Sequence, residues 1–469
     1  MSAPASPSAV GDLPLVGEAM EVPLVTGGTT RYKNLDYAAS SPALVAVAEA
    51  VTELLPHYSS VHRGAGYKSQ LSTAAYEGAR AAVHAFFDAR QDDCVVFVRN
   101  TTDAMNLLAE SLPSGSSVVA FASEHHANLL PWQKVRNVRY LACPASAGEA
   151  LVALESHLRS EPTDLVAVTG ISNVTGEVWP VADITALAHQ HGARVVLDAA
   201  QLAPHIPVSI RELSVDYLAA SGHKLYAPFG AGVLIGRPDW LGRGAPYMRG
   251  GGAVDFVTTD EVLWTTLPDR QEAGSPNVVG AVALGVAAQT LQAYGMERIG
   301  QHERELGAYA RRRLGAISAV EMYRLWPEEA DRIGLVTFNV RGFEHSLLAA
   351  ILSAEHGIGV RHGCFCAHPL MLSLLRISDA DARAVRQELR QGQRARIPGA
   401  VRLSLGLASS AEDIDALAEA ITSIVHHGPR WTYSVDAGTG DYTPTPDCRP
   451  VPRVHFPLSW THPGGGESS

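Results

Sequence analysis

The feature that most restricts the fold of this chain is a series of short apolar runs, each separated from the next by a segment with helical spacing. Strands that are buried on both faces of a parallel sheet have this unbroken apolar character, because neither face of such a strand meets solvent. The runs cover residues 95–98, 118–121, 165–168, 195–197 and 217–219. They predict an α/β fold for this part of the chain.

Segments with helical spacing lie on both sides of these runs. Before them we expect a helix that begins near residue 43 and ends at Pro56, and a second helix over about 70–88. After about residue 285 the pattern becomes a mixture of helix and strand, which predicts a smaller α+β domain. The expected elements are a long helical stretch over 278–315, a strand over 334–340, and helices over 345–356 and 411–426.

These changes of pattern divide the 469 residues into four parts. With 46% hydrophobic residues, the chain is long enough for two or three domains with sizeable cores. We predict a lead-in over 1–30, a large α/β domain over 31–285, a small α+β domain over 286–427, and an irregular Pro- and Gly-rich tail over 428–469.

Composition excludes several functions. The balance of 37 basic against 48 acidic residues argues against binding to the phosphate backbone of nucleic acids. No apolar stretch approaches the ~18 residues of a membrane span, and the N-terminus lacks the pattern of a secretory signal. The five cysteines are sparse and odd in number, so we expect no disulfide framework and place the protein in a reducing cytoplasm.

Only four of the basic residues are lysines, namely Lys33, Lys68, Lys134 and Lys224. Few groups are therefore available for any chemistry that needs an amine. Lys224 differs from the other three because it directly follows a predicted strand. A lysine at a strand end is most often a solvated charge, so the role of Lys224 has to be inferred from the residues that the fold would place near it.

Polar residues follow other predicted strands, and ligands of open α/β sheets bind beyond the carboxyl ends of strands. Thr101 and Thr102 stand where a strand runs into a helix, which suits a phosphate, although Thr-Thr-Asp is also an ordinary helix cap. Asp198 ends another strand. A lysine, a carboxylate and a phosphate-binding helix start are the parts that pyridoxal 5'-phosphate requires.

Two histidines, His125 and His126, follow a further strand. A zinc site is the alternative for this pair, but adjacent histidines project differently and no thiol or carboxylate stands at metal-ligand spacing. We therefore predict no metal site.

Three segments together resemble the signatures of class V, fold-type I pyridoxal-phosphate enzymes. They are Ser-Gly-His-Lys-Leu-Tyr at 221–226, Glu-His-His-Ala-Asn at 124–128 and Glu-Ala-Gly-Ser-Pro-Asn at 272–277. The most similar subgroup is that of the SUF-type cysteine desulfurases and selenocysteine lyases, and the likeness extends from about residue 35 to about 425. It implies a large domain with a mostly parallel, seven-stranded sheet between helices, a smaller α+β domain, and a homodimer with sites at its interface.

The resemblance implies a role for each matched residue. Lys224 would form the Schiff base, Asp198 would pair with the pyridinium nitrogen, Gln201 would donate to the ring phenolate, and His125 would stack on the ring and move protons. The phosphate would be held by Thr101, Thr102, Ser221 and His223, and by Ser275 of the partner subunit. The substrate carboxylate would be bound by Asn173 and by Arg402, whose guanidinium suits bidentate binding.

The segment around Cys366 resembles the loop that carries the nucleophilic cysteine of the SUF-type enzymes. Alignment through Arg361, Gly363 and Ala367 puts Cys366 in that position. The implied reaction converts L-cysteine to L-alanine and leaves the sulfur on Cys366 as a persulfide. Arg361, which we count among the substrate-binding residues, and two histidines near the thiolate would lower its pKa.

Three departures from the subgroup leave other reactions open. Cys364 and Phe365 replace residues that are polar or histidine there, Gly66 replaces a histidine, and a charged segment near 380–398 looks like an inserted helix. The alternatives are a C–S lyase or β-elimination, epimerisation or transamination of another amino acid, a scaffold without turnover, and a redox or two-thiol ligand role for the cysteine pair. A small amino acid and a sulfur-acceptor protein are the expected partners, with neither nucleic acid nor membrane.

Overall fold

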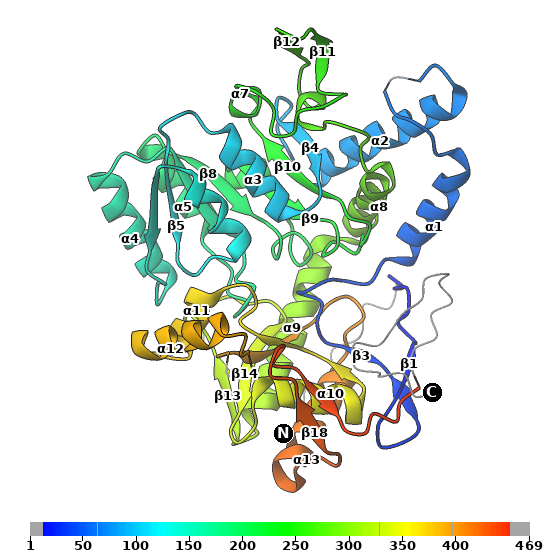
Figure 1. Cartoon of the computed structure of the whole chain (residues 1–469), viewed down its shortest axis with the longest axis vertical. Coiled ribbons are helices and arrows are strands. Elements are labelled where there is room, and N and C mark those ends of the chain that lie inside the picture. The colour runs from blue at the N-terminus through cyan, green and yellow to red at the C-terminus, as the bar shows by residue number, and fades with distance from the viewer. Residues whose placement is uncertain (1–12, 63, 328, 395–396, 451–469) are drawn as a thin grey trace.

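The computed structural model describes residues 13–450, except 63, 328 and 395–396 (Figure 1). Its larger sheet has seven strands in the order β4-β10-β9-β8-β7-β5-β6. All of them run in one direction except β10, which is antiparallel to both of its neighbours. The strands are β4 (Cys94–Val98), β5 (Ser117–Phe121), β6 (Asn137–Leu141), β7 (Leu165–Thr169), β8 (Arg194–Asp198), β9 (Tyr217–Ser221) and β10 (Gly232–Gly236).

The prediction of a mostly parallel sheet is confirmed, and each of the five apolar runs lies in a strand. Two strands have no counterpart among the predictions. In β6 the side chains are only half-buried or exposed, so its sequence has no apolar run. In β10 the apolar residues stand between Gly232 and Gly236, and β10 is the one strand of this sheet that runs against the others.

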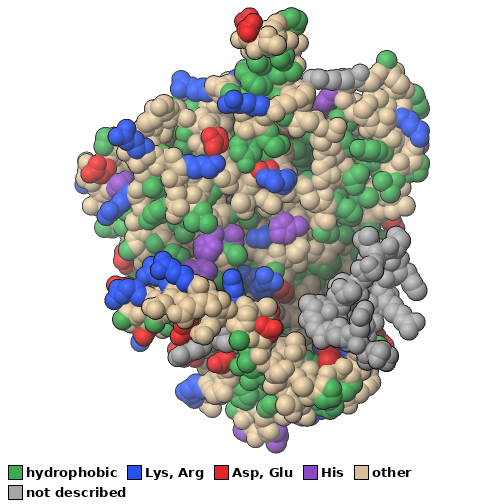
Figure 2. All heavy atoms as spheres, in the orientation of Figure 1, with side chains coloured by type: hydrophobic (Ala, Val, Ile, Leu, Met, Phe, Trp, Pro, Cys, Tyr) green, Lys and Arg blue, Asp and Glu red, His purple; other side chains and the backbone are tan. Residues whose placement is uncertain are grey.

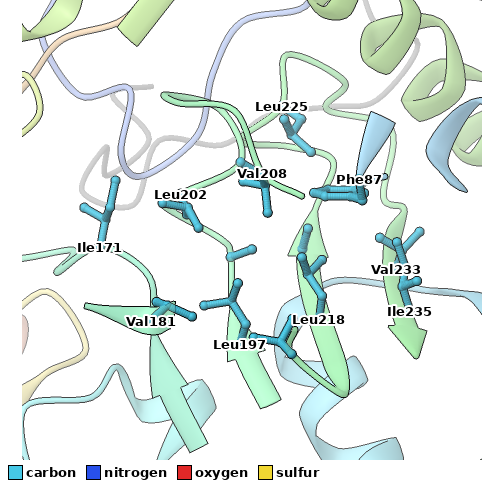
Figure 3. Packing of buried hydrophobic residues seen from close by; sticks show 14 of the residues in the cluster. Phe87, Ile171, Val181, Leu197, Leu202, Val208, Leu218, Leu225, Val233 and Ile235 are labelled. Carbon is cyan, nitrogen blue, oxygen red and sulfur yellow. The ribbon is translucent and has the colours of Figure 1, made fainter. Parts of the chain in front are cut away.

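Helices cover both faces of this sheet, because neighbouring residues of each strand point to opposite sides. Val95, Val119 and Leu197 belong to the core on one face, where α1, α2, α4, α5 and α8 pack; Figure 3 shows part of this core. Val96 and Val118 belong to the core on the other face, with α3 and α7. The helices are α1 (Val45–Leu54), α2 (Tyr67–Phe86), α3 (Thr101–Ser111), α4 (Ala147–Ser160), α5 (Val181–Gln190), α6 (Ile210–Leu213), α7 (Pro238–Leu241) and α8 (Val278–Tyr294).

A second, antiparallel sheet with the order β13-β14-β17-β16 forms the core of the lower part of Figure 1. Its apolar residues pack with those of α9, α10 and α13. The strands are β13 (Val320–Tyr323), β14 (Leu335–Val340), β16 (Arg361–Gly363) and β17 (Ala400–Ser404), and the helices are α9 (Met296–Gly315), α10 (His345–His356), α11 (His368–Leu374), α12 (Asp379–Arg390) and α13 (Ala411–His427). This arrangement agrees with the predicted α+β character, while the exact domain boundaries stay a prediction.

The long helical stretch expected over 278–315 is two helices. Gly295 has φ of 105° and separates α8 from α9, and the two axes differ by 79°. The sequence pattern continues across this break because both helices bury apolar residues. Among the described residues no single helix is long and apolar enough to cross a membrane, and only this bent pair passes by length and composition.

Both ends of the described chain hold short hairpins where we expected irregular structure. The predicted lead-in contains β1 (Glu21–Pro23) paired with β2 (Thr29–Arg31), and the predicted tail contains β18 (Tyr433–Val435) paired with β19 (Tyr442–Pro444). Residues 1–12 of the lead-in, 395–396 of the expected insertion and 451–469 of the tail lie outside the described residues.

The remaining short elements connect the larger ones. The strands are β3 (Lys33–Asn34) paired with β15 (Ile358–Gly359), and β11 (Val254–Val257) paired with β12 (Val262–Trp264); the 3-10 turns are η1 (Leu55–His57), η2 (His126–Asn128), η3 (Pro131–Lys134) and η4 (Asp269–Gln271). The expected inserted helix corresponds to α12, which has no buried side chain.

The contact between α2 and α8 generates a prediction about stability. A Cβ at Gly285 would lie 2.7 Å from the Cα of Ala79 on the facing helix, so the substitution Gly285→Ala should force the helices apart and lower the free energy of unfolding by about 1–2 kcal/mol despite alanine's better helix propensity. Gly78→Ala on α2 is the matched control, because nothing lies within 4 Å of its added Cβ; it should leave stability unchanged or raise it by up to about 1 kcal/mol. Urea unfolding of both variants measures this, and equal stabilisation by both substitutions would contradict close packing at Gly285.

Candidate active site

A cavity of about 230 Å³ lies beyond the carboxyl ends of β4, β8 and β9, between the two sheets. It collects every site residue predicted from the sequence except one. The predicted residues that line it are Thr101, Thr102, His125, Asn173, Asp198, Gln201, Ser221, His223, Lys224, Arg361, Cys366 and Arg402. The exception is Ser275, which lines a separate hollow together with Gly252 and Glu272.

Lys224 and Asp198 come to this cavity from neighbouring strands. Asp198 is the last residue of β8, where it pairs in register with Ala219 of β9, and Lys224 follows the end of β9 after a short turn. Burial lowers the pKa of Lys224 to about 8, and the nearby Asp198 carboxylate opposes that shift. Burial raises the pKa of Asp198, while the Ala200 N–H, 2.9 Å from Oδ1, and the Lys224 amine oppose it. The site thus holds an amine that loses its proton near neutral pH.

The start of α3 forms one surface of the cavity. The backbone N–H of Thr101 donates to Ser221 Oγ at 2.8 Å, and the two hydroxyl oxygens lie 2.7 Å apart. The Asn100 side chain caps the helix by accepting from Asp103 N. Hydroxyls and backbone N–H groups at a helix N-terminus are well suited to a phosphate.

His223 lies beside this surface. Its Nδ1 is 3.3 Å from Ser40 Oγ, and burial together with the Lys224 charge lowers its pKa to about 4. The imidazole is therefore neutral at physiological pH.

The tautomer of His125 follows from its hydrogen bond. The backbone N–H of Ala127 donates to His125 Nδ1 at 3.0 Å, so Nδ1 carries a lone pair and the neutral ring bears its proton on Nε2. Burial and the Lys224 charge lower the pKa of His125 to about 3, which keeps the ring neutral.

Glu124, next to His125, connects η2 to the end of β7, and the sequence analysis did not single it out. It is fully buried; its Oε1 accepts from Thr169 N at 3.0 Å and its Oε2 accepts from the Asn128 amide at 2.8 Å. Burial raises its pKa to about 8. The signal was present in the segment 124–128, but a buried structural glutamate cannot be distinguished there from a solvated one.

Arg402 brings a buried guanidinium from β17 of the smaller sheet. Its Nη1 donates to the backbone oxygen of Asn173 at 2.8 Å, its Nη2 lies 3.3 Å from Asp36 Oδ1, and its centre is 4.9 Å from the ring of Phe365. Among the described residues, Arg402 Nε has no hydrogen-bond partner. The Arg402 guanidinium is therefore held in place, while its Nε–H remains available to a ligand.

The side chain of Asn173 holds the cysteine loop, and its predicted contact with substrate stays a prediction. Its amide donates to the Phe365 oxygen at 2.7 Å, while His126 N donates to the Cys366 oxygen at the same distance. Phe365 and Cys366 have φ of 53° and 55°, a left-handed conformation that costs a non-glycine residue roughly 1–2 kcal/mol. These two bonds hold the loop so that Cys366 lines the cavity.

The histidine environment expected for Cys366 belongs to its neighbour. His368 Nε2 lies 3.1 Å from the Sγ of Cys364, and Cys366 is an exposed residue two positions along. The sequence placed both cysteines near two histidines but could not assign the contact to either one.

The residues present fit pyridoxal 5'-phosphate. The start of α3 with Ser221 and His223 would take the phosphate, Asp198 the ring nitrogen, and Lys224 the aldehyde carbon. Gln201 Oε1 is buried at the cavity without a hydrogen-bond partner among the described residues, while its amide nitrogen donates to Ala38 O. An unpaired buried polar atom of this kind is expected where a polar ligand belongs.

A sheet of this topology with a lysine and an aspartate at adjoining strand ends defines a fold-type I enzyme dependent on pyridoxal phosphate. The sequence profile of the family described as "Aminotransferase class-V" matches residues 33–417. The chain belongs to this family.

Two relatives that match over most of their length are described as cysteine desulfurases. A probable cysteine desulfurase of Halalkalibacterium halodurans is 37% identical over 398 residues, which cover 82% of this chain and 91% of the relative. A cysteine desulfurase of Cronobacter sakazakii is 39% identical over 349 residues, 72% of this chain and 84% of the relative.

Two solved structures of cysteine desulfurases match the fold of this chain. The apo structure of a cysteine desulfurase from Thermococcus onnurineus NA1 matches with a TM-score of 0.74 and 31% identity, covering 84% of this chain and 95% of that chain. The cysteine desulfurase CsdA of Escherichia coli matches with a TM-score of 0.70 and 30% identity, covering 84% and 94%.

The environment of Lys224 generates a prediction for the cofactor-free protein. Competitive acetylation followed by mass spectrometry should show Lys224 reacting half-maximally near pH 8, because only the neutral amine reacts. Lys134, whose pKa is raised by its pairing with Glu110, is the internal reference and should titrate at higher pH. In Asp198→Asn the Lys224 midpoint should fall further, since the carboxylate that favours the ammonium form is gone. A Lys224 midpoint equal to that of Lys134 would contradict the burial of this amine.

Proposed function

We propose that this chain is a pyridoxal-phosphate-dependent cysteine desulfurase, which converts L-cysteine to L-alanine and receives the sulfur on Cys366 as a persulfide. The observation that carries the proposal is that Cys366, presented by a loop with two left-handed residues, lines the same cavity as Lys224 and Arg402. The descriptions of the relatives support it.

Arg402 and Arg361 would bind the substrate. Both line the cavity, and Arg402 is oriented by Asn173 O and Asp36 before any substrate enters. A preset guanidinium fork fits a carboxylate at little entropic cost. Arg402 would thereby direct the Cα–H bond toward Lys224 and the side chain toward Cys366.

Lys224 would move the proton of the substrate's Cα. When bound, pyridoxal phosphate supplies an electron sink that stabilises negative charge at that carbon. The Lys224 amine, with its pKa lowered to about 8, has a substantial neutral fraction near neutral pH and can take the proton there. His125, neutral with its proton on Nε2, would stack on the cofactor and donate from that atom.

Cys366 would take the sulfur. Its thiolate attacks the substrate's sulfur, a new S–S bond forms, and the C–S bond of the substrate breaks, so the electron pair stays with the three-carbon product that becomes alanine. The exposure of Cys366 leaves this sulfur open to an acceptor. We propose a sulfur-acceptor protein as the further partner and the cytoplasm as the location.

A homodimer is the proposed assembly. Ser275 lies outside the cavity of its own chain, which is where a residue that serves a second copy belongs. The β11–β12 hairpin at the top of Figures 1 and 2 carries large apolar side chains into solvent, among them Phe256 (63% exposed) and Leu263 (58% exposed). Exposed apolar residues grouped on one protrusion favour an interface.

Turnover with L-cysteine and a reductant tests the reaction. We expect alanine and sulfide in equal amounts from the wild type, no product from Lys224→Ala, and a loss of at least 100-fold from Cys366→Ala, because no other group would take the sulfur directly from the substrate. Retention of the visible cofactor spectrum in Cys366→Ala controls for folding. Full activity of Cys366→Ala, or pyruvate and ammonia in place of alanine, would favour the β-elimination alternative.

The role of Arg402 has its own test. Arg402→Lys should lower kcat/KM for L-cysteine by about 10–100-fold, largely through KM, because an ammonium cannot bind a carboxylate bidentately. Arg383→Lys on the exposed face of α12 is the control and should behave like the wild type. An unchanged KM in Arg402→Lys would show that the carboxylate is bound elsewhere.

A further inference from the structure

Cys364 is one end of a row of three polar side chains beside the cavity. Its Sγ lies 3.1 Å from Nε2 of His368, the first residue of α11. His368 Nδ1 in turn lies 3.2 Å from Nε2 of His126, and the two rings are nearly parallel, at 5°. The proposed reaction uses neither Cys364 nor these two histidines.

The proton positions in this row follow from one backbone bond. The N–H of His368 donates to His126 Nε2 at 3.3 Å, and a backbone N–H can only donate. His126 Nε2 is therefore an acceptor, so the hydrogen between it and His368 Nδ1 belongs to His368. A neutral His368 then has its lone pair on Nε2, and the Cys364 sulfur lies against this ring, 3.1 Å from Nε2 and 3.6 Å from Nδ1.

The resting state of the pair is a thiol and a neutral imidazole. Burial raises the pKa of Cys364 and lowers the pKa of His368, so the proton rests on the Cys364 sulfur, 3.1 Å from Nε2. A nucleophile whose base is oriented by a third group is the arrangement that activates cysteine in catalysis. Cys364 has this arrangement, with His126 as the orienting group.

Cys364 and Cys366 are close enough to influence each other electrostatically. Burial is the main cause of the raised pKa of Cys364; the backbone N–H of Cys366 favours the Cys364 thiolate, and the charge of Cys366 opposes it. Cys364 is also the less exposed of the two, packed with Phe365, Leu370 and Met371. A sulfur atom on Cys364 would be better protected from solvent than one on Cys366.

We propose that Cys364 is a second sulfur acceptor, which takes the outer sulfur of the Cys366 persulfide with His368 as its base and His126 as a positioning residue. This inference rests on the proposed function. It gives the chain room for two sulfane sulfurs, because transfer to Cys364 frees Cys366 for another turnover.

The transfer balances without an oxidant or a reductant. His368 Nε2 takes the proton of Cys364, and the Cys364 thiolate attacks the outer sulfur of the persulfide. The bond between that sulfur and Cys366 Sγ breaks as the new S–S bond forms. Cys366 leaves as a thiolate and takes the proton from His368, so the products are a Cys364 persulfide and a Cys366 thiol.

The test counts sulfur atoms in the cofactor-loaded protein without added reductant. L-cysteine at a few equivalents per chain is mixed rapidly and quenched, alanine is quantified, and the peptide with both cysteines is sequenced by mass spectrometry. The wild type should give a burst of about two alanines per chain with sulfur on both cysteines, and Cys364→Ser about one. Cys366→Ser should give none, and Cys448→Ser, an exposed cysteine far along the chain, should match the wild type.

A second measurement addresses the base without any turnover. Iodoacetamide should alkylate Cys364 at least about 10-fold faster in the wild type than in His368→Gln, since general-base assistance is lost. The rate at Cys448 should be equal in both proteins and serves as the internal control.

The outcomes separate the two proposals. One alanine per chain in the wild type with sulfur on Cys366 alone would overturn the acceptor role while leaving the desulfurase intact. Sulfur on Cys364 in Cys366→Ser would overturn the order of transfer. A wild type that forms no alanine would refute the proposed function and the acceptor role with it, and equal alkylation in His368→Gln would refute the base.

Discussion

The charge interaction between Lys224 and Asp198 at the end of the parallel sheet is the interaction on which the rest of the site depends. Burying an isolated ammonium group costs free energy, so the pKa of a buried amine falls and the amine loses its proton more readily. The nearby carboxylate limits that loss, which leaves the pKa of Lys224 at about 8. The register between β8 and β9 holds the two groups at adjoining strand ends, so the packed sheet sets the basicity of the amine.

The smaller sheet completes the cavity with groups that the larger sheet cannot supply. Arg402 comes from β17, and the cysteine loop follows β16. Both are tied to the larger part through Asn173, whose backbone oxygen accepts from Arg402 and whose side chain donates to Phe365. Asn173 of the larger part therefore contacts both Arg402 and the cysteine loop, and Asp36 and His126 add a second contact to each.

Much of this arrangement could be predicted from the sequence, because its signals are local. The apolar runs predicted the parallel strands, and Lys224 could be singled out because lysine is scarce in this chain. The break at Gly295 was not predicted, because helical periodicity does not show where the direction of a helix axis changes. The contact of His126 with His368 spans 242 residues, so only the fold could show that these two rings meet. Ser275 remains a prediction, since one chain cannot show what it contacts in a partner.

The cysteine loop illustrates why a strained conformation indicates chemistry. Phe365 and Cys366 both adopt positive φ, and together they cost roughly 2–4 kcal/mol that a glycine pair would avoid. Hydrogen bonds from Asn173 and His126 to the two carbonyl oxygens offset that cost. A loop needed only for its shape would be built more stably from glycine, which has no side chain to present. Cysteine at such a position is accounted for by its sulfur, and the two compensating bonds hold the backbone of the loop so that Cys366 lines the cavity.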